Sequence, residues 1–342
     1  MYRDMTGGGI TRSLLLFALP MMAGSLLQQL YNVADTLIVG RALGRDALAA
    51  VGSAFTLTTF LTSVFLGLAM GAGALFAICI GRGDMAALRR AAALALCLIG
   101  AVTAVLTALV YALLSPILRF LQVPETLRGD MAGYLRIIFV GLAATFLYNF
   151  FACLLRAAGN SAAPLWFLGG AALLNVGLDL LFVLVCRWGV AGAAAATVTA
   201  QYAAGLGLTV YALRRCRELL PRRTDFRFDR RILRELLDLS LLTCVQQSAM
   251  NFGILLVQRL VDSFGPVVMA AFAAAVKIDA FAYLPVQEFG NAFSTFAAQN
   301  YGAGQPERLR QGLRRATAVS AAFSCAVAAL VVLFARPLMG LF

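Results

Sequence analysis

The stretch Leu14–Leu48, LLLFALPMMAGSLLQQLYNVADTLIVGRALGRDAL, decides the fold class. Its apolar part is long enough to cross a bilayer as a helix, and one acid, Asp35, lies inside it. At helical spacing Gln28, Asn32 and Asp35 share one face, and Tyr31 lies one turn before the acid. A carboxylate near the bilayer centre costs about 2.5–3.5 kcal/mol, so Asp35 predicts a functional site. The alternatives are silent pairing with a neighbouring helix and a position at the outer interface.

The composition indicates a polytopic membrane protein. The 342 residues are 61% hydrophobic, with a mean hydropathy of +0.86, which is more apolar surface than a soluble protein can bury. The net charge of +12 lies in short loops between apolar runs, as membrane topology requires, and we therefore expect no nucleic-acid partner. The absence of histidine leaves proton or cation chemistry to carboxylates, and seven scattered cysteines predict no disulfide framework. No cofactor is expected.

The apolar runs predict an all-α fold with nine transmembrane helices. Their ranges are 12–39, 47–80, 90–120, 131–157, 163–186, 190–213, 233–261, 266–299 and 311–341. Arginines concentrate in one set of alternate loops, including nine between Arg214 and Arg234, and the arginine-rich side is cytoplasmic. This places the N-terminus inside, in a multi-pass protein of the cell membrane, of the bacterial inner-membrane type. Arg156 is counted among those cytoplasmic loop residues.

Three regions follow from the charge distribution. Residues 1–213 form an N-terminal six-helix lobe, 214–232 a cytoplasmic linker, and 233–342 a partial C-terminal lobe of three helices. The linker is interpreted as an interfacial amphipathic segment, and a dedicated site for anionic membrane lipids is the sharper alternative.

An internal repeat crosses the linker. A gapless shift of 221 residues carries Gly44 onto Gly265 and Pro116 onto Pro337, and aligns the loops GRGDMAALRRA and GAGQPERLRQG. Because six spans separate equivalent positions, both copies have the same orientation. This predicts two pseudo-symmetric lobes related by an axis along the membrane normal, as in transporters with a site between two halves.

A second acid, Asp179, lies in the apolar segment GGAALLNVGLDLLFV. Asn175 lies one turn earlier on the same helix face. Asn149 in the fourth span and Thr197 in the sixth add oxygens if the helices form a bundle. Hard cations prefer oxygen ligands, so these residues with Asp35 predict a cation site that binds Na⁺ or holds a proton. Plain helix–helix hydrogen bonding is the alternative.

The C-terminal half also carries polar residues inside its spans. Lys277, Asp279 and Glu288 are charged, and Glu288 is placed to attract a cationic substrate, with a structural polar contact as the alternative. Pro20 and Pro285 are candidate hinges or simple kinks. We expect the substrate cavity to be lined by Gln28, Tyr31, Asn32, Gln247, Asn251, Tyr283, Gln287 and Glu288.

Several separated motifs resemble the multidrug and toxic compound extrusion (MATE) transporter family. They are LYNVADTLIVGRALGRDALAAVG, LLRAAGNSAAPLW, NVGLDLLF, GVAGAAAATVTAQY and AAQNYGAGQPERLR, and they run through the whole chain. The resemblance implies twelve helices in two six-helix lobes around a cavity open alternately to either side. It also implies export of cationic or amphipathic organic compounds, driven by inward H⁺ or Na⁺.

The resemblance extends to a cation site. It is similar to the N-terminal-lobe site of the family's DNA-damage-inducible branch, which implies coupling residues Asp35, Asn149, Asn175, Asp179 and Thr197, with Na⁺ held by Asp35, Asn175 and Asp179 if Na⁺ is the ion. Another branch carries a Glu in its seventh helix, where this chain has Gln246 and Gln247. That difference argues against a second-lobe cation site.

Other functions fit less well. A lipid-linked oligosaccharide flippase needs a cationic cavity, for which Lys277 is thin support. An intramembrane aspartyl protease needs an adjacent carboxyl dyad, and the sequence around Asp179 lacks the Gly-x-Gly-Asp context, so no enzyme is expected. A non-transporting scaffold leaves the membrane acids unexplained. The shift of 221 residues maps Phe342 onto Leu121, so we expect the counterpart of residues 122–213 to be missing, and the full-length protein to be monomeric.

Overall fold

The computed structural model describes residues 5–120, 125–262 and 266–333, and within these ranges the chain is helical with no β-strand. Short elements follow α6 and α7: the π-helix η1 (Leu180–Val185) and the 3₁₀ turns η2 (Arg217–Leu219) and η3 (Arg223–Asp225). The α-helices are α1 (Ile10–Leu43), α2 (Arg45–Gly81), α3 (Met85–Phe120), α4 (Glu125–Val140), α5 (Leu142–Ala157), α6 (Ala162–Asp179), α7 (Gly189–Arg215), α8 (Arg230–Asp262), α9 (Pro266–Gly302) and α10 (Pro306–Leu333).

The helices fall on the predicted spans. The fourth span, 131–157, is divided at Gly141, where the helices meet at an angle of 40°. By length and apolar composition, five helices in the described residues can cross a membrane, or six if this bent pair counts as one crossing. The all-helical membrane architecture is therefore confirmed, while the count of nine crossings stays a prediction.

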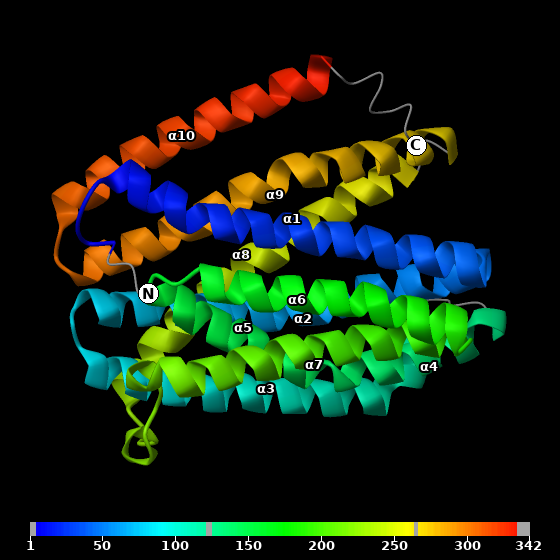
Figure 1. Ribbon diagram of the computed structural model, residues 1–342, viewed down its shortest axis with the longest axis horizontal. Coiled ribbons are helices and arrows are strands. Elements are labelled where there is room, and N and C mark those ends of the chain that lie inside the picture. The colour runs from blue at the N-terminus through cyan, green and yellow to red at the C-terminus, as the bar shows by residue number, and fades with distance from the viewer. Residues whose placement is uncertain (1–4, 121–124, 263–265, 334–342) are drawn as a thin grey trace.

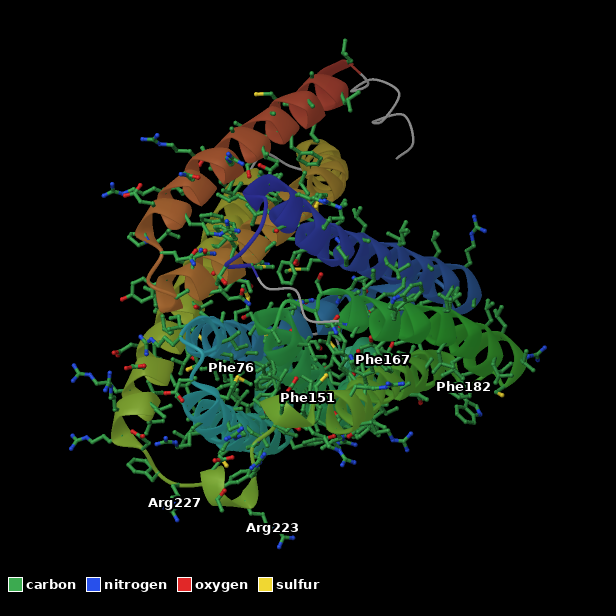
Figure 2. The ribbon with its side chains drawn as sticks, turned by 60° about the vertical axis from the view of Figure 1, so that its left-hand side comes forward. Phe76, Phe151, Phe167, Phe182, Arg223 and Arg227 are labelled. Carbon is green, nitrogen blue, oxygen red and sulfur yellow. The ribbon has the colours of Figure 1, made fainter. Side chains whose placement is uncertain are left out.

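Helix α2 lies at the centre of the packing, in contact with α3, α5, α8 and α9. Its Phe76 meets Phe150 of α5 edge to face, with ring centroids 6.1 Å apart, in a core that also holds Leu155 and Leu208. Figure 2 shows Phe76 and Phe151 among the side chains between these helices. Burial of these large apolar rings holds the N-terminal helices together.

The outer surface is apolar. Trp166, Leu173 and Val185 are each more than 70% exposed, as expected where helices face lipid rather than water. Helix α10 is the extreme case, because only 6% of its most apolar window is buried. Its main helix neighbours among the described residues are α9 and α1, and it diverges from the other helices at its C-terminal end (Figure 1).

The repeat is visible in the helix boundaries. The shift of 221 residues carries Arg45 onto Pro266 and Gly81 onto Gly302, so α2 maps onto α9 end to end. The two helices also touch reciprocally. A Cβ atom on Gly81 would collide with the backbone of Gln299, and a Cβ atom on Gly302 would collide with the backbone of Ile78. The shift of 221 residues that carries Gly81 onto Gly302 also carries Ile78 onto Gln299. This contact has local two-fold symmetry, while the division into lobes of six and three helices stays a prediction.

The predicted linker, 214–232, is tied to the start of α3. Arg89 Nε lies 3.4 Å from Asp225 Oδ2, and Arg90 Nη1 lies 3.5 Å from Asp229 Oδ2. Figure 2 shows Arg223 and Arg227 pointing away from the helices at this end of the molecule. The segment is therefore a folded turn fixed to the N-terminal helices.

The N-terminal segment is pinned between α9 and α10. Met5 is fully buried, its backbone N–H donates to Gln299 Oε1 at 3.2 Å, and its carbonyl accepts from Arg308 Nη2 at 3.1 Å. Gln299 Nε2 also donates to the carbonyl of Ala157 at 2.7 Å. One glutamine thus connects the N-terminal segment, α5 and α9.

Candidate functional site

The two membrane aspartates meet between α1 and α6. Asp35 lies in the C-terminal half of α1, and Asp179 is the last residue of α6 and fully buried. Their carboxyl groups come within hydrogen-bonding reach of each other, and Oδ1 of each is buried with no hydrogen-bond partner among the described residues. Two carboxyl groups make such a contact only when a proton or a cation lies between them.

Asn175 supports this pair from within α6. With its amide oriented to satisfy both neighbours, Nδ2 donates to Asp179 Oδ2 at 3.2 Å and Oδ1 accepts from the backbone N–H of Thr197 in α7 at 3.3 Å. Asn175 is 1% exposed, so the amide is fixed between two helices. This bond holds Asp179 in place beside Asp35.

Two tyrosines lie near the aspartates. The side chains of Tyr31 in α1 and Tyr134 in α4 both lie within electrostatic range of Asp35 and Asp179. The π-helix η1 begins immediately after Asp179, and such bulges often occur at functional sites because they locally widen the helix. Residues of α1, α4, α6 and α7 therefore lie near the pair.

A cavity of about 590 Å³ adjoins the aspartates and extends toward α8 and α9. Its size suits a drug-sized ligand, and amides and hydroxyls dominate its polar walls. Three threonines on α2, Thr58, Thr59 and Thr62, form part of one wall, while Leu165 and Leu168 on α6 provide apolar surface.

Most of the predicted site residues line this cavity. They are Gln28, Tyr31, Asn32, Asn149, Asn175, Thr197, Gln247, Gln287 and Glu288. Asp35 and Asp179 lie behind the wall rather than in it. Tyr283 is also absent from the lining; it is 43% exposed, and its hydroxyl contacts Met250 Sδ at 3.2 Å. The side chains of Asn251, Lys277 and Asp279 lie outside the part of the chain whose side chains are described.

Asn149 is not brought to the carboxyl pair by a hydrogen bond. Its Nδ2 donates to the carbonyl of Thr145, one turn earlier in α5, at 2.8 Å. Asn32 likewise bonds within α1, with Nδ2 donating to Gln29 Oε1 at 3.1 Å. Both residues line the cavity, and neither side chain has a hydrogen bond to an aspartate among the described residues.

Sequence reasoning missed three side chains at the site: Tyr134, Arg156 and Gln201. Arg156 lies in the last turn of α5 and lines the cavity, so its assignment to a loop is wrong. Gln201 of α7 also lines the cavity, and its buried Oε1 has no hydrogen-bond partner in the described residues. The signal for Arg156 was its place in LLRAAGN, a turn before the glycine that ends a helix.

Cation ligands at the site are few. Clusters of three or more His, Cys, Asp or Glu side chains suited to a metal ion are absent from the described residues. The pair of carboxyl groups and the amide of Asn175 supply oxygen donors alone, which fits a proton or a hard monovalent cation better than a transition metal.

The model of the MatE family matches residues 20–181 and 243–342, which includes both aspartates and most of the cavity. The chain belongs to the MATE family. Two curated relatives are called probable multidrug resistance proteins, both from Bacillus subtilis. YpnP is 30% identical over 90% of this chain and 68% of its own length, and YoeA is 29% identical over 97% and 73%.

Solved MATE structures show the same fold. An outward-facing multidrug resistance MATE family transporter of the MOP superfamily superposes with a TM-score of 0.92. It is 24% identical, and the match covers 99% of this chain and 75% of that one. The chain is thus a MATE-family membrane protein whose homologues are transporters rather than enzymes.

Proposed function

We propose that this protein exports organic compounds across the cell membrane in exchange for inward H⁺ or Na⁺, through alternating access of the central cavity. The contact between the carboxyl groups of Asp35 and Asp179 carries the proposal. It joins the fully buried Asp179 to the half-buried Asp35, beside a drug-sized cavity, in a chain whose curated relatives are named as multidrug resistance proteins.

The acid pair supports a two-state mechanism. Without a cation, the two carboxylates repel each other and push α1 away from α6. In this mechanism, the separated arrangement is the state that holds substrate. Binding of a proton or Na⁺ removes the repulsion and brings the side chains together, which favours release of the substrate outward. Asn175 keeps Asp179 oriented in both states.

The membrane potential can drive this exchange. A potential of 100 mV contributes about 2.3 kcal/mol for each elementary charge that moves inward. One or two cations per cycle are therefore enough to accumulate substrate outside against a gradient. The coupling ion requires no cofactor, and the substrate and surrounding lipids are the only partners proposed.

Transport by reconstituted protein tests the proposal. Proteoliposomes containing the transporter should move a fluorescent organic dye when a pH or Na⁺ gradient is imposed, and imposing each gradient separately identifies the ion. Asp35→Asn and Asp179→Asn should each abolish gradient-driven transport, because an amide keeps the size and polarity of the side chain but cannot titrate.

Asp84→Asn is the matched control. Asp84 precedes α3, and its Oδ1 accepts from the backbone N–H of Ala87 at 2.8 Å. Asparagine is an equally good cap, so this variant should transport normally. Full gradient-driven transport by both Asp35→Asn and Asp179→Asn would show that coupling lies elsewhere, and Glu288 would be the next side chain to test.

We also propose a bacterial-type inner membrane location, a cytoplasmic N-terminus and a monomeric full-length protein. The arginine distribution supports the orientation. The flippase alternative draws no support from the names of the relatives reported above, and we do not propose it.

A further inference from the structure

The cavity holds one charge of each sign. Among the described residues that line it, Arg156 and Glu288 are the charged ones. Arg156 comes from the last turn of α5, whereas Glu288 comes from the middle of α9, on the other side of the internal repeat. The two side chains thus approach the same space from different parts of the sequence.

These two charges interact without forming an ion pair. The guanidinium of Arg156 lies within electrostatic range of Glu288 and of the phenol of Tyr148. In the described part of the chain, however, neither has an ion-pair partner at salt-bridge distance. Arg156 Nε and Glu288 Oε2 are both buried and have no hydrogen-bond partner there.

Charges arranged in this way are costly for the empty protein. Both residues are half-buried, but a buried atom of an ionised group needs a hydrogen bond to offset the loss of water, and Arg156 Nε and Glu288 Oε2 have none among the described residues. A ligand with a negative group at Arg156 and a positive group at Glu288 would supply a charge partner and hydrogen bonds to each. A carboxylate can take the paired donors of a guanidinium, and an amine or delocalised cation can lie against the Glu288 carboxylate.

We propose that the cavity selects zwitterionic amphiphiles, with Arg156 binding the ligand's carboxylate and Glu288 its cationic group. The proposal rests on the proposed export function and narrows its substrate class. The cavity also has apolar surface for the ligand's body, from Leu165, Leu168 and Leu284. A ligand with only a positive charge would pair with Glu288, but it would leave Arg156 without a partner and would be repelled by the positive charge of Arg156.

Binding of two dyes to the full 342-residue chain tests this selectivity. The first dye is a rhodamine with a free carboxylate, which is a zwitterion at neutral pH, and the second is its ethyl ester, which is a cation. Fluorescence anisotropy in detergent should show the acid binding about tenfold more tightly than the ester, equivalent to about 1.4 kcal/mol. The ester's extra apolar area works in the opposite direction, so it cannot cause this result.

Three variants separate the two charges. Arg156→Gln should bring the acid-to-ester ratio close to one by weakening the acid alone, and Arg156→Lys should retain part of the ratio. Glu288→Gln should weaken both dyes to a similar extent, because both carry the cation. Arg214→Gln, at an exposed arginine outside the cavity lining, should leave both affinities unchanged.

Equal binding of the two dyes by the wild-type chain, or tighter binding of the ester, would overturn the proposal without any variant. An unchanged ratio in Arg156→Gln would overturn it as well and leave Arg156 a structural residue at the end of α5. If Arg156→Gln does not fold, the proposal is tested by the acid-to-ester affinity ratio of the wild type and by that of Arg156→Lys. If the protein transports the ester under a gradient and does not prefer the acid, the zwitterion selectivity is refuted and the export function stands. If the protein binds the acid more tightly but transports neither dye under a gradient, the export function is refuted and the selectivity stands.

Discussion

At the scale of single residues, Asn175 is the side chain on which the acid pair depends most directly. It is 1% exposed and bonds both Asp179 and the backbone of Thr197. Asn175→Ala removes both bonds; Thr197 keeps its place in the α7 ladder, but the buried Asp179 Oδ2 loses its donor, which costs about 1–3 kcal/mol. We expect a lower thermal unfolding temperature in detergent, together with weaker gradient-driven transport.

Asn149→Ala is the matched control for that prediction. Asn149 bonds only the carbonyl one turn earlier in its own helix, and that carbonyl keeps its place in the α-helical ladder when the side chain is removed. Its unfolding temperature should therefore change less than that of Asn175→Ala. A larger loss for Asn149→Ala would contradict the assigned bonding of Asn175.

The sequence predicted part of the site because some of its residues share one helix. Asn175 and Asp179 are four residues apart, and Gln28, Asn32 and Asp35 follow helical spacing, so periodicity alone places each group on one face. Tyr134 could not be found in this way, and for Arg156 the local signal in LLRAAGN gives only its place near a helix end. Their position at the site depends on how α4 and α5 bend at Gly141 and pack against other helices, which no local pattern encodes.

At the scale of helices, the glycine contact between α2 and α9 is a close approach of two backbones. Gly302→Ala would place a Cβ atom against the backbone of Ile78, so the helices must move apart. Such overpacking costs about 1–3 kcal/mol. The variant should show a lower unfolding temperature and faster amide exchange in residues 78–82.

Gly290→Ala, in the same helix, is the control. A Cβ atom there meets no atom within 4 Å, and alanine favours the helix over glycine by about 0.5–1 kcal/mol. This variant should be as stable as the wild type or slightly more stable. Equal effects of the two substitutions would show that helix propensity, and not the contact with α2, controls stability here.

The helix boundaries were largely predictable because apolar runs in a bilayer leave few alternatives to a helix. The break at Gly141 was missed, since residues 131–157 read as one continuous apolar run. The π-helix after Asp179 was missed for a similar reason: LLFVLV is compatible with either helix type, and surrounding contacts select between them.

At the scale of the whole molecule, orientation in the membrane is testable with single cysteines. Cys186 is exposed in the short connection between η1 and α7, and the linker with Arg223 lies at the other end of α7 (Figure 1). In variants that keep one cysteine, a membrane-impermeant maleimide should label Cys186 in right-side-out spheroplasts. It should label Arg223→Cys only after permeabilisation. The reverse pattern would overturn the cytoplasmic N-terminus.

A surface on a two-fold axis must be complementary to itself, as in a symmetric dimer. Gly81 and Gly302 meet that condition, since each faces the backbone three residues before the other glycine. The atoms of Ile78 and Gln299 that lie nearest to these glycines are backbone atoms, so the contact constrains the two backbones more than the two side chains. Gln299 now bonds Ala157 and Met5, while Ile78 has no amide to offer. The two halves of the chain thus behave like fused subunits, constrained where backbones touch and able to acquire new contacts on one side at a time.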